Sequence, residues 1–395
     1  MKKRFSRKLI YNFVHRLTEV LPLIFGMIVF SLIYRDASIF REAENIATTV
    51  EMRLKKSDRA DSVVLVRITD EEFRSPAFFC GQAPLNVSKV LEIVRVIAGG
   101  SPRAIGVTLE STASEEVLRL PTRSPPVVWA QRAGYSHIRK KYVLSPTNAP
   151  PRGAEIGVAT FTVDSDNLIR RYTRCFDTPS KLEPAFATIL SFRGTYRNRI
   201  PSFTEADCKL ERLIEFTGDA GSGSFLNIPV LRVYELAQNG GLSTLLEGKV
   251  VILSADYGLQ DEYETPVGWL PASHILASVV DTEERGGGRK PVGVWIVALL
   301  GLCGSVVIVL LRQVAGILWA LAAGVILTPL LAVVISRLLS GSLAYAGTFT
   351  FAVVAALCIE IYDAGKEQVK KWRDRRLGSP HSEPKSKGAT EGKAE

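Results

Sequence analysis

The sequence lacks the patterns that usually mark a metal site or a redox centre. It has only five cysteines and four histidines in 395 residues, and no two cysteines form a C-x-x-C pair. Zinc and other transition metals need several such side chains that converge on one point. The histidines are scattered along the chain, at His15, His137, His274 and His381. We therefore predict no metal site and no bound cofactor.

Catalytic motifs are missing as well. The sequence contains no phosphate-binding P-loop, no G-x-S-x-G, no H-E-x-x-H and no protein-kinase motif,. We therefore predict that the protein is not an enzyme and has no catalytic residues. One alternative stays open, because Asp256, Asp261, Glu262 and Glu264 lie in one acidic loop. That alternative is a cell-envelope enzyme or carrier that uses the loop around Asp261.

The net charge is +9, and many of the basic residues flank long uncharged runs. Membrane topology explains basic residues in these positions better than nucleic-acid binding does. Runs of this length can cross a bilayer, and basic flanks tend to stay in the cytoplasm. We predict a cytoplasmic basic leader at 1–16 and a transmembrane anchor at 17–34. Three transmembrane helices should follow within 291–361, before a short, largely disordered basic cytoplasmic tail at 362–395. The protein is then a multi-pass protein of the inner (cell) membrane.

Residues 35–290 should form one large extracytoplasmic, or periplasmic, domain. Apolar runs typical of buried strands occur at 63–68, 104–109 and 249–253, and helical patterns occur at 87–97 and 274–280,. Strands that alternate with helices predict an α/β fold with a mostly parallel, helix-covered sheet. The whole chain would combine this α/β domain with an all-α transmembrane region.

Two segments of this domain do not follow the alternation of buried strands and helices. Ile39, Ala43, Ile46, Val50 and Leu54 recur at three- and four-residue spacing, which predicts an amphipathic helix whose apolar face packs on the domain,. Residues 111–155 are rich in Pro, Ser, Arg and Thr. We interpret them as an irregular surface insertion in which only 127–130 has the character of a strand.

The most specific pattern lies at 248–281. It reads G-K-V-V-I-L-S-A-x-x-G-L-x-D-x-x-x-T-P and continues with P-x-S-H-I-L-A-S. This pattern resembles the closing segment of the CHASE type 2 (CHASE2) family, the cyclase- and histidine-kinase-associated sensory extracellular domains of type two. An acidic turn at 164–167, followed by paired arginines, is also similar to the family. The resemblance covers residues 35–290 and implies a sensor of an unidentified extracytoplasmic ligand.

The resemblance also implies partners. Relatives commonly continue after the last span into a histidine kinase, a nucleotide cyclase or a protein kinase, whereas only about thirty residues remain here. We therefore expect a receptor subunit that passes its signal through the transmembrane helices to a separate cytoplasmic protein of kinase or cyclase type, or to a membrane partner. The lipid bilayer and a second copy of the chain, in a homodimer, are further candidate partners, and nucleic acid is not. Thr108 stands where many relatives have an acidic residue, which puts a shared ligand in doubt.

The candidate ligand site combines Asp70, Arg170, Asp261 and Thr265. Open parallel sheets bind ligands at the carboxyl ends of their strands, and Asp70 and Asp261 follow two of the predicted strands. Arg170 and its neighbour Arg171 should alternate across a strand, so that at most one of them reaches a pocket.

Three cysteines, Cys80, Cys175 and Cys208, fall in the predicted extracytoplasmic domain. Thiols in an oxidising compartment tend to pair, so we predict one disulfide among them. Cys80 with Cys175 is the preferred pair, because it would join the loop after the first strand to the strand with the paired arginines.

Overall fold

The computed structural model describes most of the predicted extracytoplasmic domain. The described residues are 42, 45–46, 48–50, 52–53, 60–112, 124–145, 151, 154–195, 202–216, 225–257, 262–288, 365–366, 368–370 and 372–373. The predicted leader at 1–16, the anchor at 17–34 and the three spans within 291–361 lie outside them. The chain divides into two compact units, and the larger one begins at Arg41 and contains every described residue up to Gly288.

The smaller unit contributes only the described residues between 365 and 373, which are helical. Val369 and Trp372 are exposed there. The rest of the predicted tail at 362–395 lies outside the described residues.

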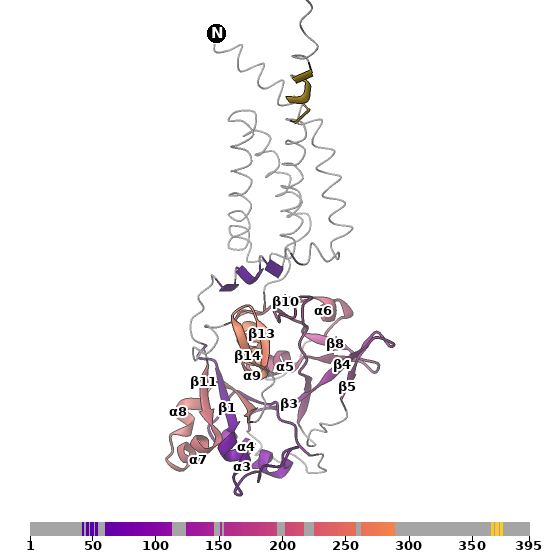
Figure 1. The fold of residues 1–395 in the computed structure, drawn as a ribbon. Coiled ribbons are helices and arrows are strands. Elements are labelled where there is room, and N and C mark those ends of the chain that lie inside the picture. The colour runs from indigo at the N-terminus through magenta and orange to yellow at the C-terminus, as the bar shows by residue number, and fades with distance from the viewer. Residues whose placement is uncertain are drawn as a thin grey trace, which may run out of the picture. The chain divides into compact units, whose positions relative to one another are not determined.

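A six-stranded parallel sheet forms the centre of the larger unit (Figure 1). Its strands lie in the order β11-β1-β12-β2-β3-β6. The α/β prediction with a mostly parallel sheet is confirmed. The strand bounds are β1 Val63–Thr69, β2 Ala104–Val107, β3 Val127–Gln131, β6 Glu155–Val158, β11 Leu226–Pro229 and β12 Val250–Asp256.

The two central strands explain why the sheet is covered on both faces. β1 pairs with β12 along its whole length, from Val63 opposite Val250 to Thr69 opposite Asp256. Side chains alternate along a strand, so neighbouring apolar residues of β1 point to opposite faces. Val63 belongs to the apolar core on one side and the next residue, Val64, to the core on the other, and both are fully buried. A strand without a polar face needs helices on both sides.

The helices supply the two layers. One side of the sheet carries α4 (Val87–Gly99), α7 (Val230–Gln238) and α8 (Leu242–Leu246). The other side carries α5 (Phe186–Thr195) and α9 (Ala272–Glu284). The helices predicted at 87–97 and 274–280 are therefore confirmed, with longer bounds. The short helices α3 (Asp70–Arg74) and α6 (Glu205–Lys209) lie in connections.

Helix α5 lies unusually close to the sheet, and glycine makes this approach feasible. A Cβ atom on Gly106 of β2 would lie 2.5 Å from the ring of Phe186. A Cβ atom on Gly157 of β6 would lie 2.5 Å from the backbone Cα of the same phenylalanine. The backbone of a packed helix cannot rotate away as a side chain can, so Gly157 is the stricter requirement.

The strand predicted at 127–130 is confirmed as part of β3, but the prediction that this part of 111–155 lies in a surface insertion is wrong. β3 lies inside the sheet between β2 and β6, and its Trp129 is fully buried. A hairpin of β4 (Ala133–Ser136) and β5 (Lys141–Leu144) follows. The polar and proline-rich flanks dominated the composition of this segment, although the strand itself is apolar.

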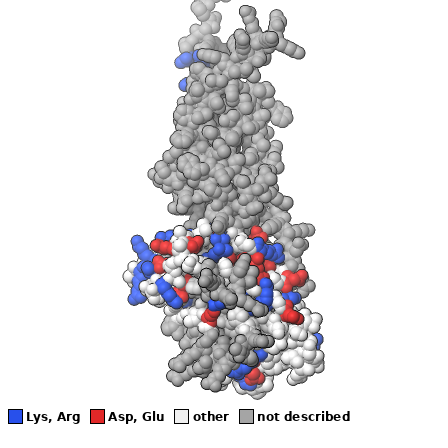
Figure 2. All heavy atoms as spheres, turned by 180° about the vertical axis from the view of Figure 1, so that it is seen from behind, with Lys and Arg blue, Asp and Glu red and all other residues white. Residues whose placement is uncertain are grey.

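The remaining strands form two-stranded ribbons outside the main sheet. They are β7 (Arg171–Tyr172) with β10 (Arg212–Leu213), β8 (Cys175–Asp177) with β9 (Leu182–Pro184), and β13 (Glu262–Thr265) with β14 (Gly268–Pro271). On the face of the molecule in Figure 2, Lys and Arg side chains lie among Asp and Glu side chains. That face shows no broad area of one charge among the described residues.

Candidate functional site

A cleft of about 550 Å³ opens where β12, β2, β3 and β6 end. This is the carboxyl edge of the parallel sheet, where such folds bind ligands, and the volume is typical of a small-molecule site. Its walls come from the loops after these strands and from the first turn of α9. The lining residues are Ala83, Pro84, Thr108, Glu110, Ala130, Arg132, Ala133, Ala159, Thr160, Phe161, Val163, Ser254, Ala255, Tyr257, Tyr263, Pro271, Ala272, Ser273 and Leu276.

One wall of the cleft combines an ion pair with an aromatic ring. Arg132 Nη1 lies 3.3 Å from Glu110 Oε1, and both side chains are more than half exposed. Tyr257 stacks on Phe73 with ring centroids 4.0 Å apart. Burial raises the pKa of Tyr257, and the negative charge of Glu110 adds to this shift. The tyrosine is therefore a neutral hydroxyl donor at ordinary pH.

The start of α9 and the end of β12 also line the cleft. Pro271 is the N-cap residue of α9, and as a proline it makes no side-chain cap hydrogen bond. Ser254 of β12 is buried, and its Oγ atom has no hydrogen-bond partner within the described part of the chain. Thr108, by contrast, donates its hydroxyl to the backbone oxygen of Leu253.

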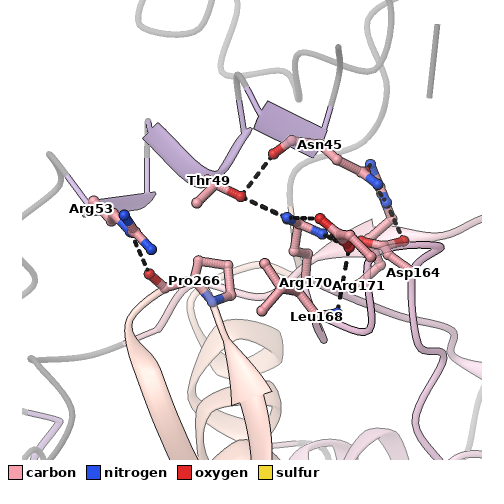
Figure 3. Close-up of polar contacts among 9 residues, drawn as sticks. Asn45, Thr49, Arg53, Asp164, Leu168, Arg170, Arg171 and Pro266 are labelled. Carbon is pink, nitrogen blue, oxygen red and sulfur yellow. Dashed lines mark hydrogen bonds and ion pairs between the residues drawn. The ribbon is translucent and has the colours of Figure 1, made fainter. Parts of the chain in front are cut away.

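A second polar feature is a buried ionic cluster, shown in Figure 3. Asp164 is almost fully buried and pairs with both Arg170, at 3.0 Å, and Arg171. Arg170 also donates two hydrogen bonds to Asp166, of 2.6 and 2.7 Å. These bonds lower the pKa of Asp166, although its partial burial acts in the opposite direction. Two aspartates and two arginines thus balance one another's charge.

The cluster holds a helix that comes from the N-terminal side, whose described residues lie between 42 and 53 (the 42–53 helix). Arg170 donates to the Thr49 hydroxyl from Nε and Nη2, at 2.9 and 2.8 Å. Arg171 donates two bonds of 3.0 Å to the side-chain oxygen of Asn45. Arg53 donates to the backbone oxygen of Pro266, at the tip of the β13–β14 hairpin (Figure 3).

The 42–53 helix packs on the domain as predicted, but not with the apolar face that was expected. Of the residues of that face, Ile39, Ala43 and Leu54 lie outside the described residues. Ile46 and Val50 are 66% and 51% exposed, whereas Asn45 and Thr48 are buried. The buried arginines need hydrogen-bond acceptors, and polar side chains of the helix supply them. The buried face of this helix therefore combines these polar side chains with Met52, which belongs to the apolar core.

A third polar cluster lies at the opposite end of α9 from the cleft. The Glu283 carboxylate accepts hydrogen bonds from the Tyr172 hydroxyl, at 2.5 Å, and from Arg174, at 2.6 and 2.8 Å. The Tyr172 oxygen accepts the backbone N–H of Gly288 at 2.8 Å. Burial raises the pKa of Tyr172, and the negative charge of Glu283 adds to this shift. The chain is therefore held in place where it leaves the domain after α9.

A comparison with protein-family models decides which family has this architecture. The model described as the CHASE2 domain matches residues 24–311, which is well over half of the chain. The chain belongs to the CHASE2 domain family. CHASE2 domains are sensory extracellular domains, so the expected resemblance is confirmed. No curated protein and no solved structure matches the chain.

The predicted ligand residues do not gather at the cleft of this CHASE2 domain. Asp70 is exposed and lies 3.7 Å from Arg74. Arg170 belongs to the ionic cluster, and buried Thr265 donates its hydroxyl to the backbone oxygen of Gly268. None of these three lines the cleft. Asp261 lies outside the described residues, and the part of all four in ligand binding stays a prediction.

Arg170 and Arg171 were expected to point to opposite faces of a strand, but both contact Asp164. Neither of them lines the cleft. Strand β7 begins only at Arg171, so the strict alternation of a strand does not apply to Arg170. The turn before it is as expected, with Asn167 in the left-handed conformation at φ 64°,.

Sequence reasoning pointed to the edge of the CHASE2 sheet at which the cleft opens but missed the residues that line the cleft. Glu110 and Arg132 carried no motif, since they come from the loops after two different strands. Thr108 was the one useful signal, because it was noted as a departure from relatives and lies in the cleft.

The CHASE2 domain contains one disulfide within its described part, between Cys175 and Cys208. The prediction of a disulfide is therefore confirmed, but the choice of Cys80 is wrong, because Cys80 is free and exposed. Helix α6, which carries Cys208, lies against β8, which carries Cys175. Cys80 belongs to the loop after α3.

The predicted spans of this CHASE2 protein are not tested by its described helices. Within the described residues, no helix combines the length and the apolar character needed to cross a bilayer.

Proposed function

We propose that this CHASE2 protein is a membrane-bound sensory receptor subunit that binds an extracytoplasmic ligand in the carboxyl-edge cleft. The signal would pass through the predicted transmembrane helices to a separate cytoplasmic protein of kinase or cyclase type. Membership of a sensory extracellular domain family supports the sensory part of this proposal. The contacts of α9 and β7 support a route for the signal inside the domain.

The observation that carries the proposal is the path of α9. Its first residues, Ala272 and Ser273, line the cleft, and Glu283 near its end holds Tyr172 and Arg174. A helix of 13 residues spans about 20 Å, so one rigid element connects the cleft with the distant cluster,. A ligand that shifts the start of α9 therefore also changes the position of Glu283.

Strand β7 connects this movement with both ends of the domain. Its two residues are adjacent in sequence but bind different segments of the chain. Arg171 holds the 42–53 helix through Asn45, and Tyr172 holds the chain after α9 through Glu283 and Gly288. The two segments that lead toward the predicted spans at 17–34 and 291–361 are thus fastened to adjacent residues. A rearrangement of one cluster changes the other.

Reporter fusions test the membrane part of the proposal. With four spans and both termini in the cytoplasm, a fusion after residue 60 should be exported and a fusion after residue 365 should stay in the cytoplasm. An exported reporter at 365, or a cytoplasmic one at 60, contradicts the topology.

Affinity purification from detergent, followed by mass spectrometry, tests the effector. We expect a kinase or cyclase to co-purify with the full chain and to be lost when residues 362–395 are deleted.

Tyr172→Phe removes the hydrogen bonds to Glu283 and Gly288, and should alter the activity of that effector without preventing membrane insertion. An effector whose activity is the same with this variant refutes the proposed route. Turnover of a substrate by the purified protein would instead favour the envelope enzyme.

A further inference from the structure

The start of α9 resembles an anion site that has been left open. The first backbone N–H groups of any α-helix have no partner inside the helix, and the helix dipole makes this end positive. In α9 the first turn contains no acidic residue, and its N-cap residue, Pro271, makes no side-chain cap hydrogen bond. Pro271, Ala272 and Ser273 of this turn line the cleft.

Another helix of the same domain shows how such a start is satisfied. Helix α7 also begins after a proline N-cap, and Pro229 there has the same backbone angles as Pro271, with φ −61° and ψ 148°. In α7 the fully buried carboxylate of Glu72 accepts the backbone N–H of Leu231 at 3.0 Å. The domain therefore places a carboxylate of its own at the start of α7. At α9 the described residues place none.

Ser254 gives a second, independent indication of a ligand. Its side chain is 1% exposed, it lines the cleft, and its Oγ atom has no hydrogen-bond partner in the described part of the chain. A buried hydroxyl without a partner costs stability, so such groups are rare unless a ligand or an ordered water satisfies them. Along β12 its neighbour Ile252, two residues earlier, belongs to the core under α9. Alternation then places Ser254 on the same face, toward that helix.

We propose that the cleft binds a small organic anion, whose carboxylate or phosphate oxygens accept the first-turn N–H groups of α9 and the hydroxyl of Ser254. The charged side chains among the lining residues are Glu110 and Arg132, which pair with each other and leave the helix start as the positive element. Phe161, Tyr263 and Leu276 provide apolar surface for the rest of the molecule. This inference names the ligand class of the proposed receptor and rests on that function.

Calorimetric titration of the full-length protein in detergent tests the inference with defined probes. The probes are acetate, succinate and inorganic phosphate, with succinamide as the uncharged counterpart of succinate. We expect at least one anion to bind with a dissociation constant of about 1 mM or below, and succinamide to bind about tenfold more weakly or not at all. Ser254→Ala should weaken the anion several-fold.

A matched pair of variants locates the site. Pro271→Asp provides a carboxylate at the N-cap of α9, so it should reduce anion affinity at least about tenfold while the melting temperature stays the same or rises. Pro229→Asp adds the same charge at the start of α7, which Glu72 already serves. It should leave anion affinity unchanged.

Four outcomes would overturn the inference. The first is that no anion binds, and the second is that succinamide binds as well as succinate. The third is that both proline variants have the same effect. Asp261→Asn checks for a competitor within the chain: if only this variant binds anions, the chain supplies its own carboxylate and the proposal fails. None of these titrations reads out membrane topology or an effector, so a failed anion site leaves the tests of the receptor function intact.

Discussion

Replacing Asp164 with asparagine should destabilise the larger unit by about 3 to 5 kcal/mol, the usual cost of breaking a buried ion pair by removing one partner. Asp164 is almost fully buried and neutralises both Arg170 and Arg171. After the substitution these buried guanidinium groups lose a shared negative charge, and the amide has the same shape without that charge. For a domain of this size, the melting temperature should fall by about 6 to 20 °C.

The matched control is Asp166→Asn. Both variants remove one negative charge from the same turn, so a general effect of net charge would be equal in the two. The Asp166 side chain is 39% exposed, although it lies 2.6 Å from Arg170. Partly exposed pairs contribute little, and we expect a loss of no more than about 1 kcal/mol.

Thermal and urea unfolding of the full-length protein, followed by near-ultraviolet circular dichroism, measures the two losses. Trypsin provides a local readout at Arg53, because cleavage there requires the 42–53 helix to leave the domain. Asp164→Asn should accelerate this cleavage more than Asp166→Asn does. If the two variants unfold within about 1 kcal/mol of each other, the charge balance at Asp164 does not hold the helix and the reasoning is wrong.

Three further predictions concern stability. Cys208→Ser should lower the free energy of unfolding by about 3 to 4 kcal/mol, because the disulfide to Cys175 closes a loop with a sequence separation of 33,; urea unfolding measures this. Gly157→Ala should lower the free energy of unfolding by about 1 to 3 kcal/mol, because the new methyl group meets the backbone of Phe186,. Thermal unfolding measures this loss. Hydrogen bonds from Arg170 lower the pKa of Asp166 in the folded protein. The stabilisation that ionised Asp166 provides should therefore be complete above about pH 4 and be lost as the pH falls through the lowered pKa. Urea midpoints of wild type and Asp166→Asn at pH 5 and 3 measure this.

Each of these three predictions has a control within the chain. Cys80→Ser removes a cysteine that is free and exposed, and should leave the urea midpoint unchanged. Gly99→Ala places a methyl group where no atom lies within 4 Å, so a loss as large as that of Gly157→Ala would refute the steric argument. A stability gap between wild type and Asp166→Asn that is wider at pH 3 than at pH 5 would contradict the sign of the pKa shift.

The central strands were predictable because their signal is local. The runs at 63–68 and 249–253 are β-branched and apolar on both faces, and a strand of this kind is buried wherever it lies in a parallel sheet. The interior position of β3 was not predicted, because no local signal indicates it. Its flanks are polar and rich in proline, and only its position between β2 and β6 shows that Val127 to Ala130 belong to the interior.

The polar contacts were not predictable to the same degree. Arg171 and Asn45 are 126 positions apart, and no spacing rule connects them. Glu110 and Arg132 meet because β2 and β3 are neighbours, which depends on strand order. Cys175 and Cys208 pair because α6 lies against β8, whereas the sequence offered three thiols with no means to rank the pairs.

The sequence by itself determined the fold class, the family and the edge of the sheet at which a ligand is expected, because burial patterns and strand ends are properties of consecutive residues. Only the tertiary structure decided which loops form the cleft, which face of the 42–53 helix is buried and how α9 reaches Glu283. Those features depend on hydrogen-bonding and charge demands between segments far apart in the chain. Many arrangements of the chain could satisfy the same donors, acceptors and charges, and only the folded path shows which arrangement is adopted.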